Sequence, residues 1–344
     1  MNARRRVTAW ILATLTVAVC GSAAQAAPRA DLTALPGEGW VAWSVPAIDV
    51  GDGPCCYTNW HNGNGRRGCV LGDQHHSLSW SDDAALDASG TNGGSDELVV
   101  YVQREGGQTR RVQALAANCP VEVDGALTRL DGVASTQSLE WLDAAVGEAR
   151  SERVREGSLV AMAHHADAMA TRLLARRAGE GESKQVREQA LFWLALTRGQ
   201  DGLPTVQHAA LHESDRHLRQ HAVFSLSQSK LPEAAATLEQ LARDTAQSDE
   251  ARGEALFWLA QSGAPSARGM AEDVLRGRPG HELEDKAIFA LSQLPSGGDA
   301  ALIGIIEGDY PRSAKKQALF WLGQSGSEDA LRAIDRLLAA GQAH

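Results

Sequence analysis

Hydrophobic and polar positions follow two different patterns along the chain. From residue 37 to about residue 125, short runs of β-branched and aromatic residues alternate with turns rich in glycine, asparagine and aspartate. From about residue 136, apolar residues recur every three or four positions instead. The first pattern is typical of short strands and the second of amphipathic helices. The sequence therefore predicts a small β-rich region followed by a longer helical one.

The clearest strand signal in the first region is a hairpin. The runs Leu98–Val102 and Val112–Leu115 flank the turn sequence Glu105–Gln108, and this order predicts two antiparallel strands. We expect Val121–Val123 to add a short strand, and Trp40–Val45 to pair with the hairpin. Together these segments predict a small β-rich domain over residues 27–135.

Four cysteines lie in this domain and none lies after it. The stretch over residues 51–94 is long, polar and rich in glycine, so it needs cross-links to hold it. An even number of cysteines in an oxidising compartment predicts disulfides. A bond between the two adjacent cysteines would close a strained ring, which leaves two possible pairings open. The cysteines are Cys55, Cys56, Cys69 and Cys119.

The helical region contains an internal repeat. A motif of the form Ala-Leu-Phe-Trp-Leu returns five times, and its phenylalanines are 32, 33, 32 and 31 residues apart. Val160 holds the same place in a degenerate earlier copy, which brings the array to about six repeats. We expect the five phenylalanines to belong to the core of the repeats. They are Phe192, Phe224, Phe257, Phe289 and Phe320.

Each copy has the plan of two helices joined by a turn of glycine, proline or serine. A helical pair of this size cannot bury its apolar surface alone, so neighbouring pairs must stack. The predicted fold is mainly α: a right-handed α-solenoid over residues 152–344, joined by a connecting helix at 136–151 to the β-rich domain. The second helices are expected at Pro204–His212, Pro232–Arg243, Ala267–Arg276, Asp299–Glu307 and Glu328–Leu338.

The repeats resemble bacterial HEAT-like repeat proteins, in the branch known as lyase-type HEAT-like repeats. The resemblance covers residues 152–341. The whole layout is similar to that of secreted bacterial HEAT-repeat proteins that carry a short cysteine-containing β segment before the solenoid. The hairpin leading to Cys119 and the helix around Leu139–Leu142 carry this second resemblance. The family implies macromolecular scaffolding, and its members often have no assigned chemistry. For this chain we expect a protein partner, no cofactor and no enzyme activity.

The N-terminus has the features of a secretory signal peptide over residues 1–26. Arg4–Arg6 supply the positive segment, Trp10–Cys20 the apolar segment, and Ala24–Ala26 an A-x-A cleavage site. Cleavage there removes three arginines and no acidic residue, so the formal net charge of −10 becomes −13. We expect Sec-type export and a periplasmic or extracellular location. No later segment is apolar enough to enter a membrane, and the acidic charge argues against binding nucleic acid.

Histidines offer the main alternative, a metal-binding protein or metalloenzyme. Four of them form two pairs with i, i+4 spacing, on consecutive helices joined by a turn, and each pair can share one helix face. Deoxyhypusine hydroxylases, which are HEAT-like, hold two irons with His-Glu pairs just before the apolar core of the first helices. His212-Glu213 and His281-Glu282 lie outside that register, which disfavours such chemistry. The four candidate ligands are His208, His212, His217 and His221.

Other motifs for chemistry are missing from the sequence. It contains no G-x-S-x-G nucleophile motif and no P-loop. The remaining hypothesis is a non-catalytic adaptor of the cell envelope that binds an envelope or extracellular protein through the mixed charges of its second helices. The expected contact residues are Arg268, Glu272, Asp273, Arg332 and Arg336.

Two further rows of residues recur in the repeats. Trp193, Trp258 and Trp321 follow the phenylalanine in alternate copies, and small residues replace them in the others. Large and small residues in alternation favour packing between layers, although a groove lined by aromatic anchors remains possible. Glutamines recur at the end of the first helix, where their amides are expected to satisfy helix-end carbonyls. They are Gln228, Gln261, Gln293 and Gln324.

Overall fold

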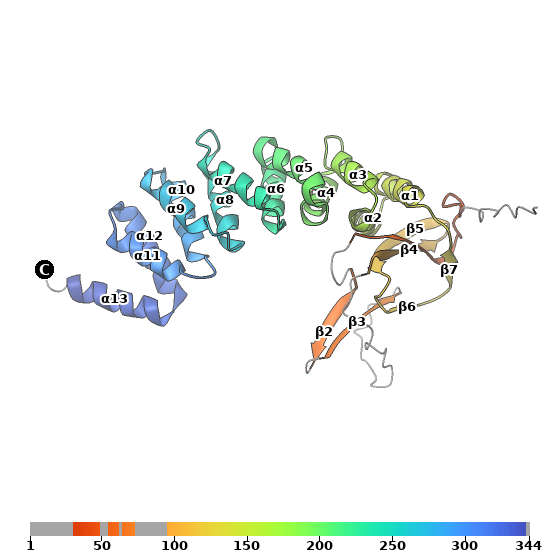
Figure 1. The fold of residues 1–344 in the computed structure, drawn as a ribbon, viewed down its shortest axis with the longest axis horizontal. Coiled ribbons are helices and arrows are strands. Elements are labelled where there is room, and N and C mark those ends of the chain that lie inside the picture. The colour runs from red at the N-terminus through yellow and green to blue at the C-terminus, as the bar shows by residue number, and fades with distance from the viewer. Residues whose placement is uncertain (1–29, 49–53, 62–63, 73–94, 342–344) are drawn as a thin grey trace, which may run out of the picture.

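The structure is a computed structural model that describes residues 30–48, 54–61, 64–72 and 95–341. A β-rich unit stands at one end of an arch of helices, and α13 stands at the other end (Figure 1). The predicted signal peptide and most of the stretch over residues 51–94 lie outside the described residues. Within the described part, no helix is both long and apolar enough to cross a bilayer.

The β-rich unit contains two small sheets. In the larger sheet, β1 (Gly39–Pro46) pairs antiparallel with β4 (Glu97–Glu105), which continues antiparallel into β5 (Gln108–Ala116). Strands β4 and β5 form the predicted hairpin, and β1 is the strand that was predicted to pair with it. The fourth strand of the larger sheet is β7 (Leu127–Leu130), which is parallel to β1. The smaller sheet consists of β2 (Tyr57–His61), β3 (Asn64–Leu71) and β6 (Val121–Val123).

The predicted disulfides are present, and the structure selects one of the two open pairings. Cys55 bonds to Cys119, and Cys56 bonds to Cys69. Cys69 and Cys119 are buried in a cluster with residues from both sheets, such as Trp40. The cross-links therefore form part of a small core that packs one sheet against the other.

Thirteen helices follow in the described residues. The connecting helix α1 (Ser135–Glu148) leads into six helical pairs, in agreement with the predicted array of about six repeats. The handedness of the array stays a prediction. The pairs are α2 (Glu152–His164) with α3 (Met169–Arg177), α4 (Lys184–Thr197) with α5 (Gly199–His212), α6 (Arg216–Gln228) with α7 (Pro232–Arg243), α8 (Asp249–Gln261) with α9 (Ala267–Arg276), α10 (His281–Ser292) with α11 (Gly298–Glu307), and α12 (Arg312–Ser325) with α13 (Glu328–Gly341).

The pairs form two layers of helices. The first-helix layer consists of α2, α4, α6, α8, α10 and α12, and its successive members pack closely on one another. The second-helix layer consists of α3, α5, α7, α9, α11 and α13, whose successive members stand further apart. Successive first helices therefore lie closer together than successive second helices, and the pairs follow one another along the arch in Figure 1.

The β-rich unit covers the first helical pair, because β5 packs directly on α2. Gly157 of α2 makes this approach possible, since a Cβ at this position would come within 1.8 Å of the carbonyl oxygen of Val112. A buried polar contact reinforces the junction. The indole Nε1 of Trp43 donates to Ser138 Oγ at 2.8 Å, and that hydroxyl lies 3.1 Å from Nε2 of His165.

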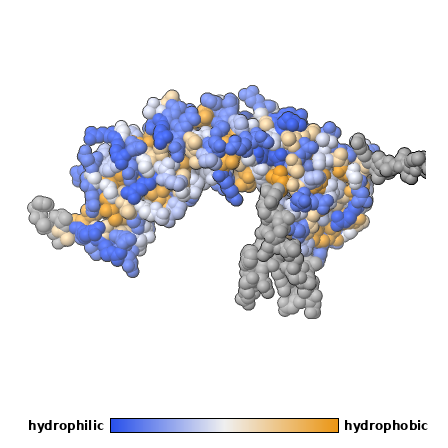
Figure 2. Space-filling view, viewed as in Figure 1, coloured by the Kyte–Doolittle hydropathy of each residue, from blue (hydrophilic) through white to orange (hydrophobic). Residues whose placement is uncertain are grey.

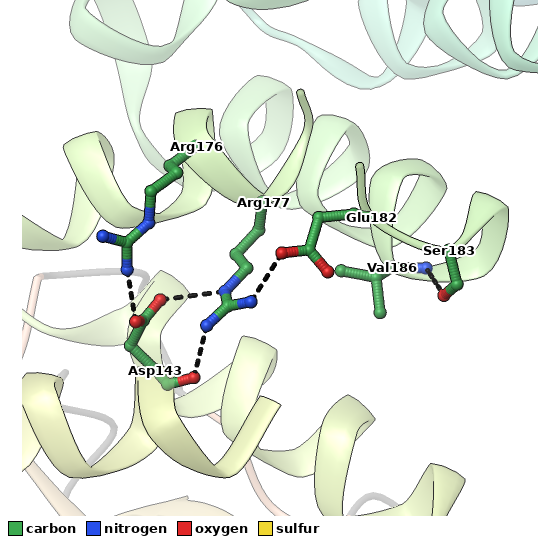
Figure 3. A network of polar contacts seen from close by, with 6 residues as sticks. All are labelled: Asp143, Arg176, Arg177, Glu182, Ser183 and Val186. Atoms are coloured by element: carbon green, nitrogen blue, oxygen red, sulfur yellow. Dashed lines mark hydrogen bonds and ion pairs between the residues drawn. The ribbon is translucent and has the colours of Figure 1, made fainter. Parts of the chain in front are cut away.

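Ion pairs hold α1 and α3 together beside this junction, as Figure 3 shows. The guanidinium of Arg177 donates to a carboxylate oxygen of Asp143 at 2.9 Å and to its backbone carbonyl at 2.6 Å. It also donates to Glu182 at 2.5 Å, in the turn that leads to α4. Ser183 then caps α4 by accepting from the backbone N–H of Val186. The side chain of Arg177 is only 11% exposed, so its pairs are largely shielded from solvent.

The close contact at Gly157 gives a first prediction. Gly157→Ala should lower the free energy of unfolding by about 3 kcal/mol, because α2 must move away from β5. The matched control is Gly304→Ala in α11, where a Cβ meets nothing within 4 Å. That change should raise stability by about 0.5–1 kcal/mol through helix propensity. Urea unfolding measures both, and wild-type stability for Gly157→Ala would show that α2 and β5 are not this close.

The buried histidine of the junction gives a second prediction. Burial lowers the pKa of His165 from 6.5 to about 4. Below pH 6.5 the unfolded chain takes up a proton that the folded chain does not, so the free energy of unfolding falls as the pH drops. From pH 6.5 to pH 5 the loss from this group is about 1.5 kcal/mol.

Urea unfolding at pH 7 and pH 5 tests this second prediction. His165→Gln should lose part of the acid sensitivity, because an amide does not titrate. His217→Gln, at an exposed position of α6, is the control and should keep the full acid sensitivity. Equal pH dependence in all three proteins would contradict the assignment to His165.

Candidate functional site

The first-helix layer presents one partly exposed face, built from the same positions of every helix. In α4, Glu188, Phe192 and Leu196 are spaced four residues apart and therefore lie along one side of the helix. The opposite side buries Ala190 and Leu194 against the neighbouring helices. We call this partly exposed side of the layer the inner face.

The phenylalanines lie on the inner face, so the prediction that they form the repeat core was wrong. None of the five is among the buried residues, and Phe320 is 53% exposed. The core is made by their neighbours, such as Leu191 and Leu194, which are at most 1% exposed. The reason is geometric. The motif is apolar on consecutive positions, and successive residues of a helix are about 100° apart, so one of them must point away from the core.

The phenylalanine rings stack in pairs across successive repeats. The rings of Phe192 and Phe224 have centroids 6.1 Å apart and planes at 11°. Those of Phe257 and Phe289 have centroids 5.6 Å apart and planes at 2°. Because the stacked faces of each pair cover one another, these rings present mainly their edges to a molecule on the inner face.

The tryptophans connect the stacked pairs into one continuous aromatic ladder. Trp258 reaches back to Phe224, and Trp321 reaches back to Phe289, each with ring centroids 4.9 Å apart. Trp193 reaches His164 in the same way, at 5.5 Å. All three tryptophans also pack on the core. The packing interpretation of the alternating tryptophans is therefore confirmed, and a groove of aromatic anchors stays a prediction.

A row of polar residues runs beside the aromatic ladder, one turn earlier on each helix. Burial raises the pKa of the Glu254 carboxyl above its ordinary value, and nearby Lys286 opposes this shift. Burial lowers the pKa of His221, and Glu188 opposes that shift. Lys286 lies across Gly253, where a Cβ would come within 2.2 Å of its side chain. Charged groups thus stand half-buried next to the rings.

The recurrent glutamines form a second polar row on the other side of the ladder. Their expected role was wrong, because none of the described bonds joins their amides to a helix-end carbonyl. Gln261 Nε2 instead donates to Gln293 Oε1 of the next repeat at 3.1 Å. The carbonyls at the helix ends accept from serine hydroxyls, as Phe289 does from Ser292 at 2.7 Å. The glutamines are left to face outward beside the rings.

Comparison with known proteins finds a match within the helical array. A protein family described as HEAT repeats matches residues 177–249. The matched segment runs from the end of α3 to the start of α8, so it contains two complete helical pairs. This segment of the chain is therefore similar to HEAT repeats. The other pairs of the array follow the same two-helix plan on either side of the match.

Two solved structures are similar to parts of the chain. Human deoxyhypusine hydroxylase in complex with glycerol is 18% identical, covers 55% of this chain and 73% of its own chain, and has a TM-score of 0.29. The complex of CpcE and CpcF of phycocyanin lyase from Nostoc sp. PCC7120 is 18% identical, covers 57% of this chain and 92% of its own, and has a TM-score of 0.31. Likenesses at this level carry no argument about activity. The search of curated proteins found no match.

The structure does not assemble the four-histidine metal site. His208 and His212 approach each other on α5, with ring centroids 5.1 Å apart. His221 lies instead against Phe224 on α6. Across the described residues, no three His, Cys, Asp or Glu side chains are grouped so that they could hold a metal ion. The histidine pairs are therefore separate features of two helices.

The charged residues expected to bind a partner lie on the second-helix layer. Arg268 pairs with Glu272 at 2.8 Å, and Glu272 also pairs with Arg276 at 3.1 Å. Arg332 pairs with Glu328 at 3.2 Å within α13. The ion pairs within each helix offset these charges. Contact of these residues with a partner stays a prediction, but the inner face offers the stronger candidate surface.

The sequence did carry a signal for the inner face. Bulky core residues tolerate exchange among leucine, isoleucine, valine and methionine, as Leu191, Val223, Leu256 and Ile288 illustrate at the position before each phenylalanine. The following position holds phenylalanine in all five copies. A position that holds the same residue in all five copies fits a role other than ordinary core packing.

Proposed function

We propose that this protein is a non-catalytic scaffold that holds a polypeptide segment of a partner protein along its inner face. The observation that carries the proposal is the aromatic ladder, a continuous row of partly exposed rings over five repeats. Aromatic residues are enriched at the centre of protein interfaces, where their contact area costs little side-chain entropy. Figure 2 shows that apolar patches interrupt an otherwise polar surface.

The two polar rows give the ladder the composition of an interface. Apolar side chains of a partner would pack on the ring edges, while the outward-facing amides of Gln261 and its equivalents can donate to and accept from its main chain. Glu188 and Glu254 on one part of the face, and Lys286 and Lys316 on another, supply charges of both signs along its length. This unequal distribution of charge would set the direction in which the segment lies.

Crosslinking in cells tests the inner face directly. A photo-crosslinking residue at Gln261, beside the ladder, should give one adduct of defined mass. The control position is Arg268, which is also exposed but belongs to the second-helix layer, and it should give none. Adducts from Arg268 alone would place the partner on the second helices. Failure of both positions, in cells that express the protein normally, would count against the scaffold function.

We further propose that the scaffold acts outside the cytoplasm, as an adaptor of the cell envelope. The basic and apolar N-terminal segment supports export, and the two disulfides are consistent with an oxidising compartment. Fractionation followed by intact-mass measurement should give a protein that begins at Ala27, outside the cytoplasm and with both disulfides formed. An uncleaved protein in the cytoplasm with free thiols would contradict export.

A further inference from the structure

The last helical pair exposes a surface that every earlier repeat buries. The residue before the phenylalanine is Leu191, Val223, Leu256 or Ile288 in the first four copies of the motif, and each is at most 1% exposed. The equivalent Leu319 is 42% exposed. The tryptophan after the phenylalanine reaches back to the preceding repeat, as Trp258 does to Phe224, so the residue before the phenylalanine lies on the side of the next repeat. Leu319 therefore belongs to a stacking surface of the same kind, left open.

This open surface, which we call the end face, has two halves of opposite charge. Arg312, Lys316, Leu319 and Gly323 are spaced four, three and four residues apart and so share one side of α12. Glu328, Leu331 and Asp335 share one side of α13 by the same rule, and Leu331 is 57% exposed. All seven residues are exposed. The end face thus has a basic half and an acidic half, each with a leucine.

The charges of the end face are largely available for a partner. Within the described part of the chain, Arg312, Lys316 and Asp335 form no ion pair. Glu328 pairs with Arg332 of its own helix at 3.2 Å, but its side chain is 89% exposed. An exposed pair of this kind contributes little and can be exchanged for another.

The other end of the array cannot receive this surface. There the β-rich unit covers the first pair, and β5 leaves no room even for a Cβ at Gly157. A head-to-tail filament of stacked arrays is therefore blocked. What remains for a second copy is a closed contact in which two end faces meet about a twofold axis.

We propose that the end face joins two copies of this chain into a dimer. A twofold axis parallel to the helices, between α12 and α13, places the basic α12 of each copy on the acidic α13 of the other. A twofold axis across the helices would instead set α12 on α12 and α13 on α13, with like charges opposed. Charge complementarity selects the first arrangement, in which each leucine of one half also packs on the other half. This inference does not depend on the scaffold function.

Sedimentation equilibrium of the mature chain, residues 27–344, tests the dimer. The wild-type protein should show a monomer–dimer equilibrium that weakens as salt is added. Leu319→Glu should weaken it at least tenfold, since a charge is placed in the apolar contact. Leu196→Glu is the matched control, a leucine that is 44% exposed on α4, and it should dimerise as the wild type does. Circular dichroism verifies that both variants fold, which their exposed positions favour.

Charge exchange tests the arrangement. Lys316→Glu and Asp335→Lys should each weaken the dimer, because each places two like charges together. The two changes in one chain should restore it, because a twofold axis parallel to the helices sets Lys316 of one copy opposite Asp335 of the other. A protein that stays monomeric at all concentrations, or a dimer that tolerates Leu319→Glu, would overturn the proposal. Single effects without restoration in the double variant would overturn the twofold arrangement.

Discussion

The burial of aliphatic side chains between successive helical pairs is the interaction on which the array depends. Leu191, Val223, Leu256 and Ile288 are at most 1% exposed where a further pair follows, and the equivalent Leu319 of the last pair is 42% exposed. A single helical pair would expose this position, so each pair gains its stability from the pairs beside it. The same stacking fixes which side of each helix remains open. The inner face is therefore a product of the packing that holds the fold together.

Close stacking of the first helices also explains why aromatic rings occupy the open side. Helices that approach this closely bring residues at the same position of neighbouring repeats within ring contact, as with Phe257 and Phe289. Stacked rings shield one another from water, so a row of phenylalanines is tolerated where isolated ones would be costly to expose. The array can carry an apolar stripe at its surface and still keep a surface that is polar elsewhere.

Much of the fold could be predicted from the sequence because it follows from local rules. The recurrence of the motif gave the number of helical pairs, and the runs around Glu105–Gln108 gave the hairpin. The cysteines gave disulfides but left two pairings open, because pairing depends on how the two sheets meet. The junction at Gly157 and His165 could not be predicted from the sequence for the same reason, since it joins residues far apart in the chain.

The candidate site was predicted less well, for a physical reason. In the run Ala-Leu-Phe-Trp-Leu all positions are apolar, so hydrophobicity does not tell which side faces the core. Only the angle between neighbouring pairs decides that Leu191 is buried and Phe192 is not. The charges of the second helices were visible in the sequence, but their pairing within each helix, as for Arg268 and Glu272, offsets them.

The two disulfides have a consequence for the fate of the chain in a compartment that contains proteases. Cys55 and Cys56 are neighbours, yet one is bonded across 64 residues and the other across 13. A cut of the backbone anywhere between residues 70 and 118 leaves Cys55, Cys56 and Cys69 in one fragment and Cys119 in the other. The Cys55–Cys119 bond still joins the fragments, so the nicked protein remains a single covalent molecule until a reductant reaches that bond.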